Sequence, residues 1–213
     1  ELKTGFFLER NEHTNNLIKK NKKKLSELKN NAVIGTSSYR REFQIKNIRS
    51  DLNCKLIRGN VDTRIKKLKE GLYDGIILAY AGIKALMIEN EVSEIFSTQK
   101  IVPSAGQGII SLQCRQGDGE IISILEKINH KETYYRAFTE RNILKVLEGD
   151  CETAVGAYSK IDGDSITVEA ELFSLDGSQR FYEKQTNNVK KFKEIGLEIG
   201  KILKSKSNNS YKR

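Results

Sequence analysis

Two segments rich in glycine and hydroxyl residues, each followed by arginines, contain the residue types that bind anions. Residues 35–41 read GTSSYRR and residues 58–64 read RGNVDTR. Backbone N–H groups and hydroxyls are accessible where a strand enters a helix, and the positive end of the helix favours an anion. Arginine binds planar carboxylates through two parallel hydrogen bonds. We therefore expect the two segments to converge on one polyanion.

Either segment alone is also explained by helix capping and surface arginines, so the binding interpretation depends on their occurring together. Phosphate would suit the same donors as well as carboxylate does. The chain contains neither GxxxxGK[ST] nor GxGxxG, so a nucleotide-binding fold has no motif support.

A third candidate is Cys151, which lies in a polar loop where an electrophile can reach its thiol. Its two acidic neighbours would raise the pKa of the thiol, and Arg141 would offset this if the fold brings it close. From the residues alone, an exposed cysteine without a function is the simpler interpretation. Cys54 and Cys114 lie in apolar segments and are expected to be small buried hydrophobes. The absence of CxxC and Cys/His clusters makes a zinc site improbable, and the cysteine usage fits a reducing compartment.

The two anion-binding segments lie in a regular alternation of strands and helices. Strands are predicted at 32–34, 54–57 and 73–81, and helices at 40–48, 61–70 and 84–91. This alternation predicts βαβ units and a mostly parallel sheet, whose carboxyl edge would bear both segments. Residues 1–31 are predicted to be a remnant followed by a basic linker or solvated insertion, with a short strand at 4–8.

The second half of the chain has a different pattern. Helices are predicted at 121–128, 133–147 and 189–204, and strands at 109–114, 155–161, 165–175 and 179–186. Asp-Gly pairs mark the turns of an antiparallel sheet. We therefore expect a βαβ domain at 32–104, a return segment at 105–120 and a small α+β domain at 121–213.

Composition restricts the classes of function. The chain has 38% hydrophobic and 31% charged residues and a net charge of +9, which is typical of a soluble globular protein. Much of the excess charge lies in residues 19–24 and 201–213, where lysines are usually solvated. A nucleic-acid binder is a further interpretation of this charge, but aromatic residues are not interleaved with a basic face. No apolar run reaches the roughly 20 residues that span a bilayer, and no signal-peptide pattern is visible.

Five motifs resemble those of the porphobilinogen deaminase (hydroxymethylbilane synthase) family, in the family's order. They are residues 34–41 (IGTSSYRR, similar to IGTSSLRR), 57–64 (IRGNVDTR, similar to LRGNVxTR), 73–82 (YDGIILAYAG, similar to YDAIILAxAG), 103–108 (PSAGQG, similar to PAxGQG) and 147–151 (LEGDC, similar to LEGGC). The resemblance implies a periplasmic-binding-protein-like βαβ domain with a mostly parallel mixed sheet, followed by an α+β domain with a three-stranded antiparallel sheet.

The resemblance also implies an activity and a cofactor. The family's enzymes are transferases of heme and tetrapyrrole biosynthesis that join four porphobilinogen molecules into hydroxymethylbilane and release ammonia. A dipyrromethane cofactor would be bound through a thioether to Cys151. The residues expected to line its cleft and hold its carboxylates are Thr36, Ser37, Ser38, Arg40, Arg41, Arg58, Gly59, Asn60, Arg64, Gln107 and Arg141.

Three departures from the family pattern lead to further expectations. The HSxKDxP motif, whose aspartate would act as general acid, does not occur, so we expect most of the first domain to be missing and no catalytic residue in this chain. Residues 105–120 would return into that domain, which could act in trans, and the chain alone would be inactive. Ala85 stands where many members have arginine, and Asp150 stands where glycine is usual.

The expected partner is the small-molecule substrate porphobilinogen, with no metal, nucleic acid or membrane, and the expected state is a monomer. The expected location is the cytoplasm or a plastid, without secretion. The alternative function is a non-catalytic domain of the same architecture that binds carboxylates or other anions reversibly.

Overall fold

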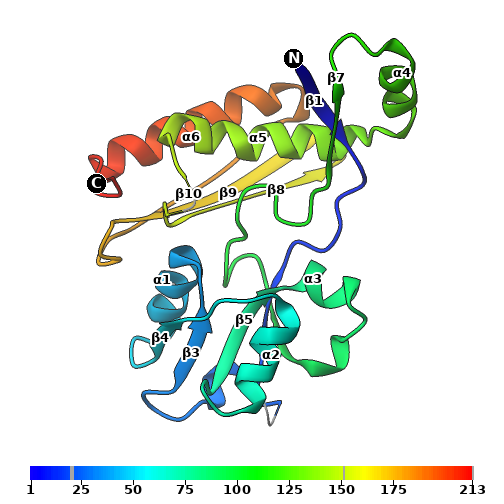
Figure 1. The fold of residues 1–213 in the computed structure, drawn as a ribbon. Helices are drawn as coiled ribbons and strands as arrows, with labels where there is room; N and C mark the ends of the chain where they lie inside the picture. The colour runs from blue at the N-terminus through cyan, green and yellow to red at the C-terminus, as the bar shows by residue number, and fades with distance from the viewer. Residues whose placement is uncertain (20–21, 151, 213) are drawn as a thin grey trace.

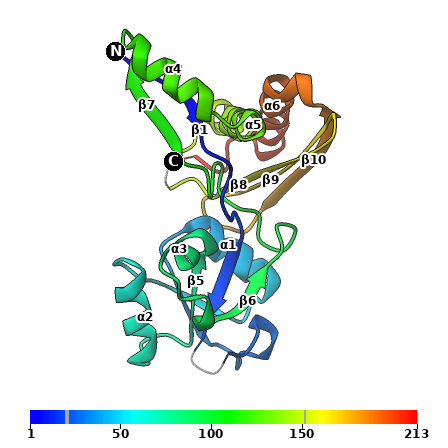
Figure 2. The same ribbon diagram turned by 90° about the vertical axis from the view of Figure 1, so that its right-hand side faces the viewer.

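The computed structural model describes residues 1–19, 22–150 and 152–212. Two units are connected by two crossing segments, residues 8–14 and 97–110 (Figure 1). One unit is built on a five-stranded sheet, and the other has two long helices over a three-stranded sheet (Figure 2). The crossing segments are joined to each other, because Asn11 N donates to Gly108 O at 2.8 Å and Leu8 N donates to Ile110 O at 3.2 Å.

The five-stranded sheet has the order β4-β3-β5-β2-β6. Its strands are β2 (Asn15–Ile18), β3 (Val33–Thr36), β4 (Asn53–Leu56), β5 (Gly75–Ala79) and β6 (Val92–Phe96). β3 runs parallel to β4 and β5, whereas β2 runs antiparallel to both β5 and β6. Ile76, Ile77 and Leu78 of β5 are buried, as expected of a strand covered on both faces. The prediction of a mostly parallel mixed sheet is confirmed.

The helices of this unit begin where the parallel strands end. They are α1 (Tyr39–Ile48), α2 (Val61–Lys69) and α3 (Tyr80–Ala85), with short 3-10 turns at Leu25–Glu27 and Glu89–Glu91. α1 and α2 match their predicted positions. The prediction of a helix at 84–91 is wrong, because α3 begins directly after β5 and ends at Ala85. The sequence did not predict β6, which follows at Val92–Phe96.

The expectation that residues 11–31 form a solvated insertion is also wrong. β2 lies between β5 and β6, and all four of its residues are buried. Leu25 is likewise fully buried. β2 is hard to predict from the sequence because two of its four residues are asparagines. Asn16 Nδ2 donates to Leu78 O at 3.2 Å, and this hydrogen bond offsets part of the cost of burying the amide.

The second unit matches its prediction closely. It contains α4 (Gly119–Ile128), α5 (Lys131–Leu147), β8 (Val155–Asp162), β9 (Ser165–Phe173), β10 (Arg180–Asn188), a 3-10 turn (Val189–Lys191) and α6 (Phe192–Ser207). β9 is the central strand of an antiparallel sheet, and α5 and α6 cover one face (Figure 1). Buried residues such as Ile143, Leu172 and Leu203 form one core between helices and sheet.

A small ribbon completes the structure. β1 (Leu2–Phe7) pairs antiparallel with β7 (Ser111–Arg115), which confirms the strands predicted at 4–8 and 109–114. Within the described ranges, no helix has the length and apolar character needed to cross a bilayer.

Candidate anion-binding site

The two arginine-containing segments meet at one edge of the five-stranded sheet, because β3 and β4 are parallel neighbours. We call residues 37–39, 41 and 58–64 the arginine edge. Ser38 caps α1 by accepting a hydrogen bond from Arg41 N at 3.4 Å, and Asn60 caps α2 by accepting one from Thr63 N at 2.9 Å. Ser37 Oγ donates to Ile57 O at 2.6 Å, which ties the first segment to the second. The first turns of two helices therefore lie at this edge.

Two guanidinium groups influence each other at the arginine edge. Arg41 Nε donates to Asn15 Oδ1 at 2.9 Å, and Arg64 Nε donates to Gly59 O at 2.7 Å. Burial, together with the positive charge of Arg64, lowers the pKa of Arg41 to about 10. Across the described residues, neither arginine forms an ion pair with a carboxylate. A negatively charged ligand would supply the missing compensation.

Arg58, Gly59 and Asn60 are exposed at the arginine edge. Gly59 has a φ of +120°, and a Cβ atom there would collide with the side chain of Thr63. Glycine is therefore needed for the turn that brings the Arg58 backbone next to α2. Lys67 Nζ donates to Arg58 O at 2.9 Å and adds another cation to the same edge.

Arg40 lies in a different environment from the other predicted site arginines. It is only 4% exposed, and its Nη1 atom donates to Val102 O at 2.6 Å. Its Nη2 atom donates to Gln107 Oε1 at 3.4 Å. Burial holds the pKa of Arg40 well below its usual range, and the charge of Arg41 acts in the same direction, while Glu171 opposes both. In this structure Arg40 connects α1 to a crossing segment.

Gln107 links Arg40 to the other crossing segment. Its Nε2 atom donates to His13 O at 2.6 Å and to Thr14 O at 3.0 Å. Thr36 is also buried, and its hydroxyl accepts a hydrogen bond from Ser38 N at 3.2 Å. The predicted site residues of the first unit thus divide into the arginine edge and a buried set that braces it.

The remaining predicted site residues lie in the second unit. Arg141 is exposed on α5, and Cys151 lies outside the described residues. The Asp150 carboxylate accepts hydrogen bonds from Glu152 N at 2.9 Å and from Thr153 N at 3.0 Å. These bonds lower the pKa of Asp150, so a negative charge is held beside position 151.

The other two cysteines were predicted to be small buried hydrophobes, and only Cys114 is fully so. Cys114 is buried at 8% exposure, and Cys54 is half-buried. Burial raises the pKa of the Cys54 thiol to about 11, so this thiol stays protonated and weakly nucleophilic near neutral pH.

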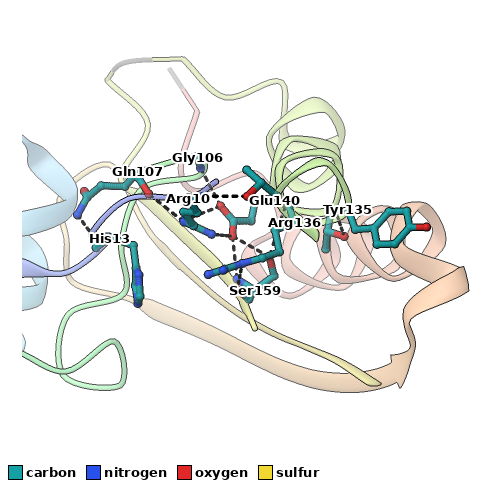
Figure 3. A network of polar contacts seen from close by, with 10 residues as sticks. Arg10, His13, Gly106, Gln107, Tyr135, Arg136, Glu140 and Ser159 are labelled. Carbon is teal, nitrogen blue, oxygen red and sulfur yellow. Dashed lines mark hydrogen bonds and ion pairs between the residues drawn. The ribbon is translucent and has the colours of Figure 1, made fainter. Parts of the chain in front are cut away.

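Sequence reasoning missed a buried ion pair that joins a crossing segment to α5 (Figure 3). Arg10 Nη1 lies 2.6 Å from Glu140 Oε1, and Arg10 Nη2 lies 3.2 Å from Glu140 Oε2. Glu140 also accepts hydrogen bonds from Gly106 N at 2.7 Å and from Ser159 N at 2.8 Å. One signal in the sequence could have indicated this pair. Glu140 shares the apolar face of its helix with Ala137 and Ile143, and an acid on such a face needs a buried partner.

An aromatic stack lies beside this ion pair. The ring centroids of His13 and Tyr158 are 4.5 Å apart at an angle of 18°. The guanidinium groups of Arg10 and Arg136 lie 5.2 and 5.5 Å from the same tyrosine ring. Burial lowers the pKa of His13 to about 4, and both arginines contribute to this effect. The imidazole is therefore neutral near pH 7.

The fold defines an α/β unit with an added α+β unit, and the arginine edge is its candidate anion-binding site. Comparison with known families makes the assignment specific. Residues 1–123 match the family described as porphobilinogen deaminase, dipyromethane cofactor binding domain, and residues 134–205 match porphobilinogen deaminase, C-terminal domain. The chain belongs to the porphobilinogen deaminase family.

Curated relatives support this assignment. The porphobilinogen deaminase of Desulforamulus reducens is 41% identical over 187 residues, which cover 88% of this chain and 60% of the relative. That of Coxiella burnetii (strain RSA 493) is 37% identical over 213 residues, which cover 100% of this chain and 69% of the relative. The chain thus spans about three fifths of the length of the relative from Desulforamulus.

Similar solved structures include a lipoprotein of the YaeC family from Enterococcus faecalis, with a TM-score of 0.40, 13% identity, and coverage of 62% of this chain and 64% of that chain. An ancestral arginine-binding protein gives a TM-score of 0.34 at 22% identity and covers 62% of each chain.

The family match bears on the expectation that most of the first domain is missing. The match to the cofactor-binding domain begins at residue 1 and extends to residue 123, and it gives that expectation no support. The domain boundaries at 32, 105 and 121 and the absence of a catalytic residue stay predictions.

Proposed function

We propose that the protein containing this chain is a hydroxymethylbilane synthase that polymerises four porphobilinogen molecules with release of ammonia. The observation that carries the proposal is the arginine edge. Arg41 and Arg64 lie close enough for one charge to lower the pKa of the other, and no carboxylate of the described chain compensates them. Each pyrrole of the proposed substrate carries an acetate and a propionate, which are the groups that this edge is suited to bind.

The residues present fit a dipyrromethane cofactor. Such a group carries several carboxylates, and the donors at the arginine edge are guanidinium groups, hydroxyls and the first turns of two helices. When bound, the cofactor supplies the primer to which pyrrole units are added. We propose that Cys151 holds it through a thioether and that Arg41, Arg58 and Arg64 bind its carboxylates or those of the growing chain.

The buried set would keep the arginine edge in place during the reaction. Arg40 and Gln107 connect α1 to both crossing segments, so α1 and its first turn cannot move independently of them. Their proposed part in the reaction is to orient Arg41 and the first turn of α1 rather than to contact an open ligand. The general acid that protonates the departing amine is not assigned to a residue of this chain.

The proposal is tested by the intact mass of the full-length protein under denaturing conditions after exposure to porphobilinogen. We expect a mass gain of two pyrrole units on the peptide that contains Cys151. Cys151→Ser should abolish the gain and leave the circular dichroism spectrum unchanged, whereas the control Cys54→Ser should acquire the cofactor normally.

An unmodified wild-type protein, or normal loading of Cys151→Ser, would contradict the proposal. Reversible binding of porphobilinogen without any gain in covalent mass would support the alternative, a non-catalytic carboxylate-binding protein.

A further inference from the structure

The carboxy-terminal residues fold back onto the loop that contains position 151. α6 ends at Ser207, and Asn208 and Asn209 adopt left-handed backbone conformations with φ of 46° and 59°. Asparagine tolerates this region better than most residues, so the chain can reverse here. Leu175 N then donates to Ser210 O at 3.0 Å, which fixes the reversed segment against the turn between β9 and β10.

Tyr211 enters the core of the second unit after this reversal. Its side chain is part of the cluster that contains Leu147 and Leu172, and the residue is only 3% exposed. Its hydroxyl donates to Leu147 O at 3.0 Å. Leu147 is the last residue of α5, and the final carbonyls of a helix have no partner within the helix. Tyr211 therefore satisfies the carbonyl at the point where the loop leaves α5.

Other groups hold the same end of α5. Lys204 Nζ lies 3.4 Å from Val146 O and 3.4 Å from Glu148 Oε2, and Lys212 also pairs with Glu148. These ion pairs are exposed, and exposed pairs contribute little stability. The hydrogen bond of the Tyr211 hydroxyl is thus the least exposed of these contacts at the end of α5.

The reversed segment and the loop line one cleft of about 520 Å³. Tyr211 and Lys212 form one side, Asp150 and Thr153 belong to the loop, and Tyr39 of α1 faces it from the first unit. The cleft therefore lies between the end of the arginine edge and the loop that contains position 151. A shift of the carboxy-terminal residues would move the wall of this cleft.

We propose that Tyr211 is a positioning residue that holds the end of α5 and residues 148–150 in the geometry needed for cofactor attachment at Cys151. This inference rests on the proposed function and adds a residue outside the family motifs. Tyr211 acts through the carbonyl of Leu147 and does not contact the cofactor.

The test compares Tyr211→Phe with the wild type in the full-length protein. The substitution keeps the buried ring and removes one hydrogen bond, so amide hydrogen exchange in the peptide spanning residues 147–154 should become about fivefold faster. The rate of cofactor attachment, followed by intact mass after adding porphobilinogen to the apo-protein, should fall by a similar factor. The control is Tyr182→Phe, which removes a half-buried hydroxyl on β10 in the same unit, away from the loop.

The outcomes separate this inference from the proposed function. Wild-type protein that loads on Cys151, together with a Tyr211→Phe variant that loads and exchanges at the wild-type rates, overturns the inference alone. Faster exchange without slower loading, or equal effects in Tyr182→Phe, also overturns it. Wild-type protein that never gains mass overturns the proposed function itself and, with it, the positioning role.

Discussion

The arginine edge and the Arg10–Glu140 pair use the same side chain in opposite ways. At the edge, the charge of Arg64 lowers the pKa of Arg41, and neither arginine pairs with a carboxylate of the described residues. In the interior, Arg10 and Glu140 are 2% and 0% exposed at their side chains and form a bidentate pair. Glu140 thus supplies the counter-charge of Arg10 where a crossing segment packs against α5. Arg41 and Arg64 form no ion pair among the described residues, so a ligand could supply their counter-charge.

The largest expected effect comes from breaking the satisfied pair. Glu140→Gln leaves Arg10 buried without a counter-charge, and we expect a loss of about 3–5 kcal/mol in the free energy of unfolding, measured by urea denaturation. The matched control is Glu42→Gln, which breaks an exposed pair with Lys46 at 2.7 Å and should cost about 0.5 kcal/mol. Equal losses in the two variants would mean that burial does not distinguish the pairs.

The next effect concerns the uncompensated charges. Arg41→Ala should weaken porphobilinogen binding by about 10- to 100-fold, because a charge-assisted hydrogen bond is worth about 1.5–3 kcal/mol. Its effect on unfolding should be under about 1 kcal/mol, since repulsion from Arg64 is removed along with the bond to Asn15. Binding is measured by isothermal titration calorimetry.

The control for Arg41 is an arginine that has its own carboxylate. Arg49 lies 2.6 Å from Asp51 at the far end of α1, and Arg49→Ala should leave ligand affinity unchanged. If Arg41→Ala lowered the free energy of unfolding by more than it lowered the free energy of ligand binding, the proposed contrast between the arginine edge and the Arg10–Glu140 pair would be wrong.

The smallest effect is a pH dependence within the crossing segments. The folded-state pKa of His13 is about 4, below the ordinary value of 6.5, so the unfolded chain takes up the proton first. The stabilisation is fully present above pH 6.5 and is lost as the pH falls toward 4. We expect the loss to be on the order of 1–2 kcal/mol, because the ring is only partly buried.

This pH dependence is measured as the free energy of unfolding between pH 7 and pH 4, in the wild type and in His13→Gln. The variant should show a shallower decline over that interval. Parallel curves for the two proteins would show that His13 is not the group responsible.

Sequence patterns predicted the elements whose apolar residues repeat clearly, such as β5, α5 and the three strands of the second unit. They failed for β2, because a four-residue strand with two asparagines has no alternation to detect. Its burial depends on pairing with β5 and β6, which are distant in the sequence. The caps Ser38 and Asn60 were predictable because capping is decided by adjacent residues.

The roles of individual arginines were less predictable than the motifs that contain them. Arg40 and Arg41 are neighbours in one motif, yet Arg40 is buried against Val102 while Arg41 lies at the arginine edge. Neighbouring positions on a helix point in different directions, so the motif alone cannot separate a ligand-binding arginine from a bracing one. Arg10 and Glu140 are separated by 130 residues, and only the tertiary structure brings them together.

The position of β2 has a consequence for the order in which the protein folds. Asn16 donates a hydrogen bond to Leu78, which follows it by 62 residues. The other edge of β2 pairs with β6, which lies still later in the sequence. Closing so long a loop lowers the entropy of the chain before the contacts that stabilise it can form, and such long-range pairing slows folding. During synthesis, β2 therefore stays without its sheet neighbours until β5 and β6 have left the ribosome.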